Sequence, residues 1–261
     1  MSTDGRRYIF AGHAIGAQAH FHKLDDVMNL DHHIPTLGAS VLPPTGGLST
    51  SKVNNYCYQV SHPRRRTLLS VHRIETMARG KQKGDVLETE TEAEIESIDV
   101  LEKVHIDLVH VHVLATRQSL DDEAVITTKG LNIQGVHLGP VEVRVTLKDE
   151  EVFCCCGNAR QVEKFFKERN LSLASPVGHP IKQYHIVKSI EIVAGPEDQR
   201  ADIDIHDNVI HWRGFGRMHF GEVIVKDQDR QVTMVRLQMG SDGGGSGSVG
   251  DGHSNGSTGS N

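Results

Sequence analysis

A strict alternation of polar and apolar residues dominates the middle of the chain. Residues 88–96 read Glu-Thr-Glu-Thr-Glu-Ala-Glu-Ile-Glu, and we name this segment the glutamate ladder. An extended strand would place its five carboxylates on one face and the threonine, alanine and isoleucine side chains on the other, whereas a helix would scatter them around its axis. The ladder therefore predicts a β-strand with one face toward a core and one toward water.

An arginine-rich run, residues 62–79, precedes the ladder, and the polar loop Gly80–Gly84 separates the two. A short polar loop bounded by glycines is typical of a β-hairpin. Counting outward from the ends of this loop places His72 opposite Glu92 and leaves an apolar face on the other side. The two charge runs then neutralise each other. The alternative is a carboxylate surface that collects cations or a basic partner.

The alternation changes phase after Ser97, because Ile98 and Val100 take over as the apolar positions. An extended strand keeps its phase unless an extra residue or a bend interrupts it. We therefore predict a β-bulge or a strand bend near residues 97–98.

Other segments with strand character are bounded by glycine, proline or charged turns. We predict strands over residues 8–22, 53–58, 104–114, 124–128, 131–136, 141–147, 184–193, 201–205, 209–212, 217–226 and 231–239. The proline-containing stretch 25–47 is predicted to be irregular.

One helix is predicted at about 158–170, where Asn158 is a good N-cap and Val162, Phe165 and Phe166 form an apolar stripe. Residues 240–261 contain nine glycines and six serines, a composition typical of a flexible tail.

These elements predict an all-β fold, either an antiparallel sandwich or a barrel-like pair of sheets, with one α-helix near 158–170 and a disordered C-terminal tail. The expected organisation is a β-rich part over residues 1–150 that contains the charged hairpin 62–103. A second part, residues 151–239, would supply the helix and the C-terminal strands and pack on the first as one globular unit. Residues 240–261 would be the flexible Gly/Ser tail.

Composition narrows the function classes. A chain of 261 residues with 37% hydrophobic residues and one tryptophan can build one large core from strands with wet outer faces. The net charge of −6 argues against a dedicated nucleic-acid binder. No apolar run is long enough for a membrane span or a signal peptide, so we expect no membrane association and a cytoplasmic location.

Seventeen histidines make metal binding the main chemical candidate, because imidazole is the commonest metal ligand. Two His-x-His pairs and one His-x-Asp pair each place their side chains on one face of a strand. Chance alone predicts about one pair of each kind in a chain of this composition. The candidate ligands for Zn or Fe are His20, His22, His105, Asp107, His110 and His112.

The His105-Ile-Asp107 spacing is also that of the two-histidine, one-carboxylate iron site. A third ligand there would be His206 or His211. The alternative for all these histidines is a polar position on a half-exposed strand.

The chain has four cysteines, of which Cys154, Cys155 and Cys156 are contiguous, so they form no disulfide framework. The triplet immediately precedes the predicted helix, whose dipole would favour a thiolate. We therefore regard all three as candidates for a reactive thiol. The alternative is burial, which cysteine tolerates well.

Two function classes follow. The first is a non-catalytic β-rich binding or self-assembly module that uses strand edges and charged faces, with a homo-oligomer or another protein as its partner. The second is a metal-binding protein or a mononuclear metal-dependent enzyme built on the clustered histidines. The sequence contains no His-Glu-x-x-His helix and no Cys-x-x-Cys pair, so the zincin and zinc-ribbon classes lack their usual support.

Overall fold

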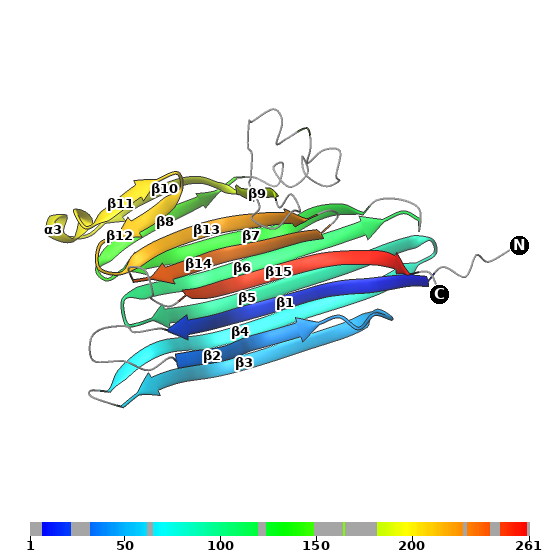
Figure 1. Cartoon of the computed structure of the whole chain (residues 1–261), viewed down its shortest axis with the longest axis horizontal. Helices are drawn as coiled ribbons and strands as arrows, with labels where there is room; N and C mark the ends of the chain where they lie inside the picture. The colour runs from blue at the N-terminus through cyan, green and yellow to red at the C-terminus, as the bar shows by residue number, and fades with distance from the viewer. Residues whose placement is uncertain are drawn as a thin grey trace, which may run out of the picture.

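Two antiparallel β-sheets pack together in the computed structural model of the chain (Figure 1), so the predicted all-β pair of sheets is confirmed. The structure describes residues 7–21, 32–61, 65–119, 124–148, 164, 182–226, 229–240 and 246–259. Among these residues, no helix has the length and the apolar character needed to cross a membrane.

The first sheet, which we name the ladder sheet, has seven strands in the order β10-β8-β7-β6-β5-β4-β3. Six of them follow one another along the chain and form a meander, and β10 pairs with the last of the six. The strands are β3 (Gly47–Val60), β4 (Arg66–Lys83), β5 (Val86–Val100), β6 (Val104–Arg117), β7 (Val125–Leu138), β8 (Val141–Leu147) and β10 (Val187–Ala194).

The second sheet contains the first and last strands of the chain, and we name it the terminal sheet. Its order is β11-β12-β13-β14-β15-β1-β2, and β9 also pairs with β13. The strands are β1 (Arg7–Phe21), β2 (His32–Val41), β9 (Lys182–His185), β11 (Ile203–His206), β12 (Val209–Trp212), β13 (Gly216–Lys226), β14 (Asp229–Met239) and β15 (Ser246–Gly259). A short exposed helix, α3 (Glu197–Arg200), connects β10 to β11.

Several predicted strands agree with the structure, and β8 and β12 have the predicted bounds. Three differences stand out. β7 joins two predicted strands into one, and the predicted strand 184–193 is divided between β9 and β10, which lie in different sheets. In addition, β2 lies inside the stretch 25–47 that we expected to be irregular. The predicted helix at 158–170 lies outside the described residues except for Lys164, which is helical.

Residues 246–259 of the glycine- and serine-rich C-terminal segment form β15, where we expected a flexible tail. This strand lies between β14 and β1 in the middle of the terminal sheet, with Asp251 paired to Thr233 on one side and to Ile15 on the other. Composition predicted a tail because glycine and serine have little intrinsic preference for strands. Two flanking strands supply the hydrogen bonds, and the small residues let β15 lie directly against Val109 and Val111 of the ladder sheet.

The charged hairpin β4–β5 forms as predicted, but its turn and register differ. The turn contains only Gly84 and Asp85, because Gly84 takes a positive φ of 62° that permits a two-residue connection. Gly80 lies within β4 and not in the turn. It packs closely against Phe10 and Leu42, and any side chain at this position would collide with both. Glu92 therefore pairs with Met77 rather than with His72.

A transverse row of bends crosses the ladder sheet, and we name it the phase-shift row. An alternating strand buries every second residue, but across the row successive buried residues are three apart. The pairs are Val71 and Ile74 in β4, Ile95 and Ile98 in β5, Ile106 and Val109 in β6, and Ile133 and Val136 in β7. Alternate strands place a residue with positive φ in the row: Asn55, Ser97 and Gly135. The bend predicted near residues 97–98 is thereby confirmed.

The terminal sheet has a matching row of bends, with positive φ at Gly38, Gly221 and Gly250. These glycines allow close approach of the two sheets. A Cβ atom built on Gly38 would lie 2.3 Å from Cγ2 of Ile74, and one built on Gly250 would lie 2.8 Å from Cγ1 of Val109. The two rows therefore face each other across the core, and the ladder-sheet side chains occupy the space that the glycines leave.

Substitution Gly250→Ala tests both the row and the place of β15. Alanine at φ 68°, facing Val109, should lower the free energy of unfolding by about 2 to 4 kcal/mol, from backbone strain and overpacking together. Gly252→Ala is the matched control, because its Cβ would make ordinary contacts of 3.4 Å or more, and we expect a change of less than about 1 kcal/mol. Urea denaturation measures both. Equal stabilities for the two variants would contradict the packing of β15.

Candidate metal centre

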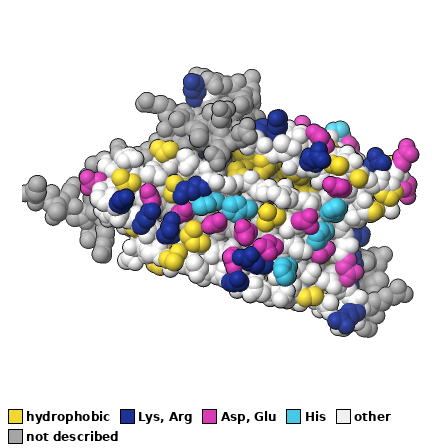
Figure 2. Space-filling model, turned by 180° about the vertical axis from the view of Figure 1, so that it is seen from behind, with side chains coloured by type: hydrophobic (Ala, Val, Ile, Leu, Met, Phe, Trp, Pro, Cys, Tyr) yellow, Lys and Arg dark blue, Asp and Glu magenta, His cyan; other side chains and the backbone are white. Residues whose placement is uncertain are grey.

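Histidine, acidic and basic side chains lie next to one another on the face of the molecule seen from behind Figure 1, without separating into large patches of one sign (Figure 2). On the outer face of the ladder sheet, the register places these residues opposite one another. The turn Leu101–Lys103 joins β5 to β6 and sets Glu92 opposite His112 and Glu94 opposite His110. The glutamate ladder thus meets the His-x-His pair of the next strand.

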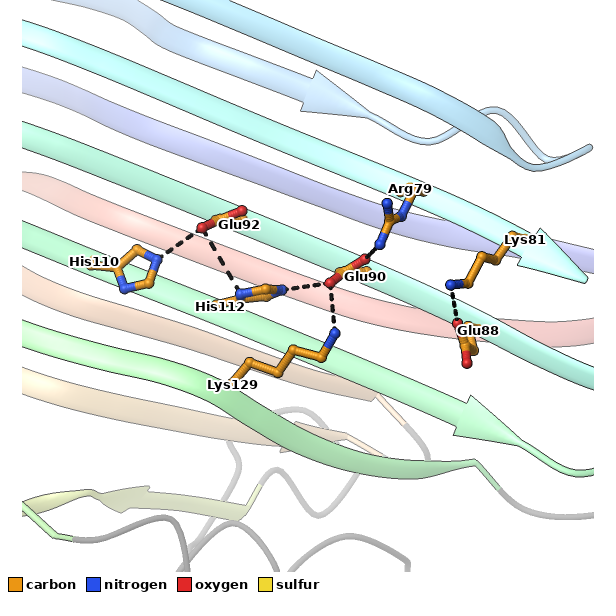
Figure 3. A network of polar contacts seen from close by, with 8 residues as sticks. All are labelled: Arg79, Lys81, Glu88, Glu90, Glu92, His110, His112 and Lys129. Carbon is orange, nitrogen blue, oxygen red and sulfur yellow. Dashed lines mark hydrogen bonds and ion pairs between the residues drawn. The ribbon is translucent and has the colours of Figure 1, made fainter.

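Glu92, His110 and His112 converge on this face (Figure 3). Oε1 of Glu92 lies 3.0 Å from Nε2 of His110 and 3.9 Å from Nδ1 of His112. Among the residues that the structure describes, these three are the one group of histidine, cysteine and acidic side chains whose ligand atoms all lie within 4.8 Å of one another. All three side chains are half-buried.

Glu90 lies beside this group and is much less exposed, at 6% against 35% for Glu92. Its Oε1 accepts hydrogen bonds from Nε2 of His112 at 2.8 Å and from Nζ of Lys129 at 3.0 Å, and its Oε2 is paired with Arg79. Burial alone would raise the pKa of Glu90. The bonds from Lys129, His112 and Arg79 outweigh it and hold the pKa at about 2.

Two local features of β7 shape the site. The register between β6 and β7 shifts between the pairs His112 with Gly130 and Val113 with Thr128, so Lys129 is an extra, bulged residue. Such bulges redirect a side chain, and here the lysine reaches Glu90. Gly130 gives room to His110, since a Cβ there would lie 2.9 Å from Cε1 of that imidazole.

The three side chains fit a small divalent metal with nitrogen and oxygen ligands. Zinc bonds of about 2.0 to 2.2 Å in a tetrahedron require ligand atoms roughly 3.4 Å apart, and the two distances to Glu92 Oε1, 3.0 and 3.9 Å, bracket that value. Three protein ligands leave a fourth position for water or another ligand. The geometry therefore permits an ion to bind with only small movements of the side chains.

The model of one protein family, described as a domain of unknown function (DUF8256), matches residues 8–172 of the chain. The chain belongs to the DUF8256 family. The matched range contains β1 to β8, and hence Glu90, Glu92, His110, His112 and Lys129. Comparison with curated proteins and with solved structures returns no match.

Among the described residues, the other predicted ligands of this DUF8256 protein lie away from the centre. His20 lies on β1 in the terminal sheet, with its ring 5.6 Å from that of His33, and His22 lies outside the described residues. His105 and Asp107 lie on β6, but His105 is five residues from His110, or about 16 Å along the strand. Of the five predicted ligands that the structure describes, only His110 and His112 belong to the group with Glu92.

His105 and Asp107 instead bond each other. Nε2 of His105 lies 2.9 Å from Asp107 and its Nδ1 lies 3.1 Å from Asp99. The Asp107 carboxylate fills the space that a side chain at position 135 would need, so only glycine fits there. The alternative third ligands of the iron site, His206 and His211, lie on β11 and β12 of the other sheet.

The predicted reactive thiols, Cys154, Cys155 and Cys156, lie outside the described residues. A further motif, Gly252-His-Ser-Asn-Gly256, has the Gly-x-Ser-x-Gly spacing of a hydrolase nucleophile elbow. That elbow requires a sharp turn from a strand into a helix. Here the whole motif lies inside β15 and pairs with β1, so the elbow geometry is absent from this segment.

Sequence reasoning missed Glu92 as the third member of the group. The ladder was assigned to the outer face correctly, but its partner was sought only on the arginine-rich side. The signal was present in the short connection between Val100 and Val104, because counting outward from it sets Glu92 opposite His112. Both strands that flank the ladder bond to its glutamates: β4 supplies Arg79, and β6 supplies His110 and His112.

The two carboxylates around His105 predict a pH-dependent stability. Partial burial lowers the pKa of His105, but its hydrogen bonds to Asp107 and Asp99 prevail and raise the pKa. The imidazolium therefore stabilises the fold below the unfolded-state pKa of about 6.5, and this contribution is lost as the pH rises through the higher folded-state value. Relative to His105→Gln, the natural protein should lose stability from about pH 6.5 upward in urea titrations. Parallel pH curves for the two proteins would contradict this.

Proposed function

We propose that the protein binds a divalent transition-metal ion through Glu92, His110 and His112. The observation that supports this most directly is the convergence of two imidazole nitrogens and one carboxylate oxygen within 4.8 Å. A carboxylate that orients one of the two histidines accompanies it, as in many metal sites of proteins.

The ligand set indicates the class of metal. Two imidazoles and one carboxylate suit Zn²⁺, and the same set with open positions suits Fe²⁺, whereas Mg²⁺ and Ca²⁺ prefer sites made of oxygen atoms alone. Arg79 and Lys129 surround Glu90, so the carboxylates here add little excess negative charge. Attraction by charge alone would be weak, which favours ions that bind nitrogen strongly.

Zinc titration of the full chain tests the proposal. Isothermal titration calorimetry should show one site per chain for the natural protein, and His110→Ala, His112→Ala or Glu92→Gln should each weaken it by at least tenfold. Zinc at 100 times its Kd should raise the free energy of unfolding by about 2.7 kcal/mol, and a chelator should remove this gain.

His72→Ala is the matched control, because this exposed histidine lies on the same sheet and contacts Asn55 instead of the centre. Its zinc affinity should equal that of the natural protein. An equal loss in the control, or no zinc binding by the natural protein, would contradict the proposed function.

A second function is supported by the strand edges, and it is self-assembly or binding of a protein partner. Among the described strands, β3 pairs with β4 alone along fourteen residues, so its other edge carries backbone groups that another strand could pair with. At the start of β3, Leu48 is 64% exposed, and Val41 at the end of β2 is 65% exposed. These two apolar side chains lie on neighbouring edge strands, β2 of the terminal sheet and β3 of the ladder sheet. The partner we propose is a second copy of the chain.

Light scattering coupled to size exclusion tests this second function. The natural protein should show a mass that rises with concentration toward a dimer, because the apolar edges bury each other. The double substitution of Val41 and Leu48 by lysine should shift it to a monomer, as charge on an edge opposes pairing. A natural protein that stays monomeric at all concentrations would rule out self-assembly.

A further inference from the structure

We propose that the metal is held by different nitrogens of the two histidines, Nε2 of His110 and Nδ1 of His112, and that Glu90 imposes this difference without touching the ion. This inference rests on the proposed function. It makes Glu90 a positioning residue, whose carboxylate holds Nε2 of His112 and leaves only the other nitrogen for the metal.

The first step is that Glu90 is immobilised. Three side chains bond to its carboxylate. Lys129 and His112 donate to Oε1, and Arg79 donates to Oε2. Figure 3 shows these three approaching Glu90 from separate strands. Neighbouring Glu88 pairs instead with Lys81 at 2.7 Å and stands apart from both histidines.

The second step concerns the proton on His112. An ionised carboxylate can only accept hydrogen bonds, so Nε2 of His112 must carry the hydrogen in its 2.8 Å bond to Glu90. Arg79 and Lys129 are both ion-paired with Glu90, so its carboxylate meets His112 as a hydrogen-bond acceptor. Neutral His112 then has its bare lone pair on Nδ1.

The third step is the direction of each ring. Nδ1 of His112 faces Oε1 of Glu92 at 3.9 Å, whereas His110 presents Nε2 to the same oxygen at 3.0 Å. In the metal-free protein Nε2 of His110 donates its hydrogen to Glu92. Because Glu92 is paired with no lysine or arginine in the described structure, a metal can take the place of that hydrogen while the ring carries its proton on Nδ1. The two rings are inclined by 69° with their centroids 6.3 Å apart, so they present different edges to Glu92. A metal ion placed between these three atoms would therefore contact Nε2 of His110 and Nδ1 of His112.

Glu92 and Glu90 thus have different roles, although they occupy equivalent positions in the same alternating motif: Glu92 is a ligand and Glu90 positions His112. Both glutamates reach diagonally across to β6, Glu90 to His112 and Glu92 to His110. Only Glu90 has a lysine and an arginine on it, and these cations keep its carboxylate away from the ion. Glu92 has no such cation in the described structure and is available as a ligand.

The test is zinc binding by the full chain labelled with ¹⁵N, observed in long-range proton–nitrogen spectra of the imidazoles. Bound zinc should shift Nδ1 of His112 and Nε2 of His110, while Nε2 of His112 keeps its proton. In Glu90→Gln the amide can donate as well as accept, so either nitrogen of His112 becomes available. Zinc affinity should fall by about 10- to 100-fold, and the signal of Nδ1 ligation should be lost or divided.

Glu88→Gln is the matched control, since it removes a carboxylate from the same ladder face that contacts neither histidine, and its affinity and spectra should be those of the natural protein. Lys129→Met is a second variant in case Glu90→Gln does not fold, as judged by circular dichroism. It removes one of the bonds that hold Glu90 and should weaken zinc binding by about fivefold.

The outcomes separate this inference from the proposed function. Zinc ligation through Nε2 of His112 in the natural protein, or a Glu90→Gln affinity equal to that of Glu88→Gln, would overturn the role of Glu90 and leave the metal site intact. A natural protein that binds no zinc at Glu92, His110 and His112 would overturn both.

Discussion

Every long strand of this sandwich must keep its apolar side chains inside while the sheet bends, and the phase-shift row satisfies that requirement. At the row, buried residues are three apart instead of two, as with Ile95 and Ile98. The bend changes which later residues face outward. It brings Glu90, Glu92, His110 and His112 to the outer face on one side of the row, and Asp99 and His105 to the same face on the other. Without the shift, one of these two groups would point into the core.

The core on the opposite face depends on the same row. Glycines of the terminal sheet, such as Gly16 and Gly38, leave the space into which Ile74 projects, and Gly250 does so for Val109. This explains how a strand of glycine and serine can lie in the centre of a sheet, because large side chains there would push the sheets apart. The C-terminal strand is thus coupled to β6, the strand that carries the two histidines.

Much of this could be predicted from the sequence, because side-chain alternation reports directly on which face of a strand is buried. The ladder face, the phase change after Ser97 and the strand β12 were predicted from that signal. The register of β4 against β5 could not be predicted in this way. Gly80 and Gly84 are both typical of the end of a turn, and only the packing of Phe10 on Gly80 places Gly80 inside β4. Strand β15 has no apolar pattern of its own, and it forms because β14 and β1 supply its hydrogen bonds. His110 and His112 were found from spacing, whereas Glu92 needed the register of β5 against β6.

The centre itself shows how identical residues diverge through their neighbours. Glu90 and Glu92 occupy equivalent positions in one alternating motif, yet the bulged Lys129 and Arg79 hold only the first. The most direct test of the account is anomalous X-ray diffraction at the zinc absorption edge, on crystals of the natural protein equilibrated with zinc. The account predicts one strong peak about 2 Å from Oε1 of Glu92, Nε2 of His110 and Nδ1 of His112. A map without a peak there, with zinc bound only at other histidines, would contradict it.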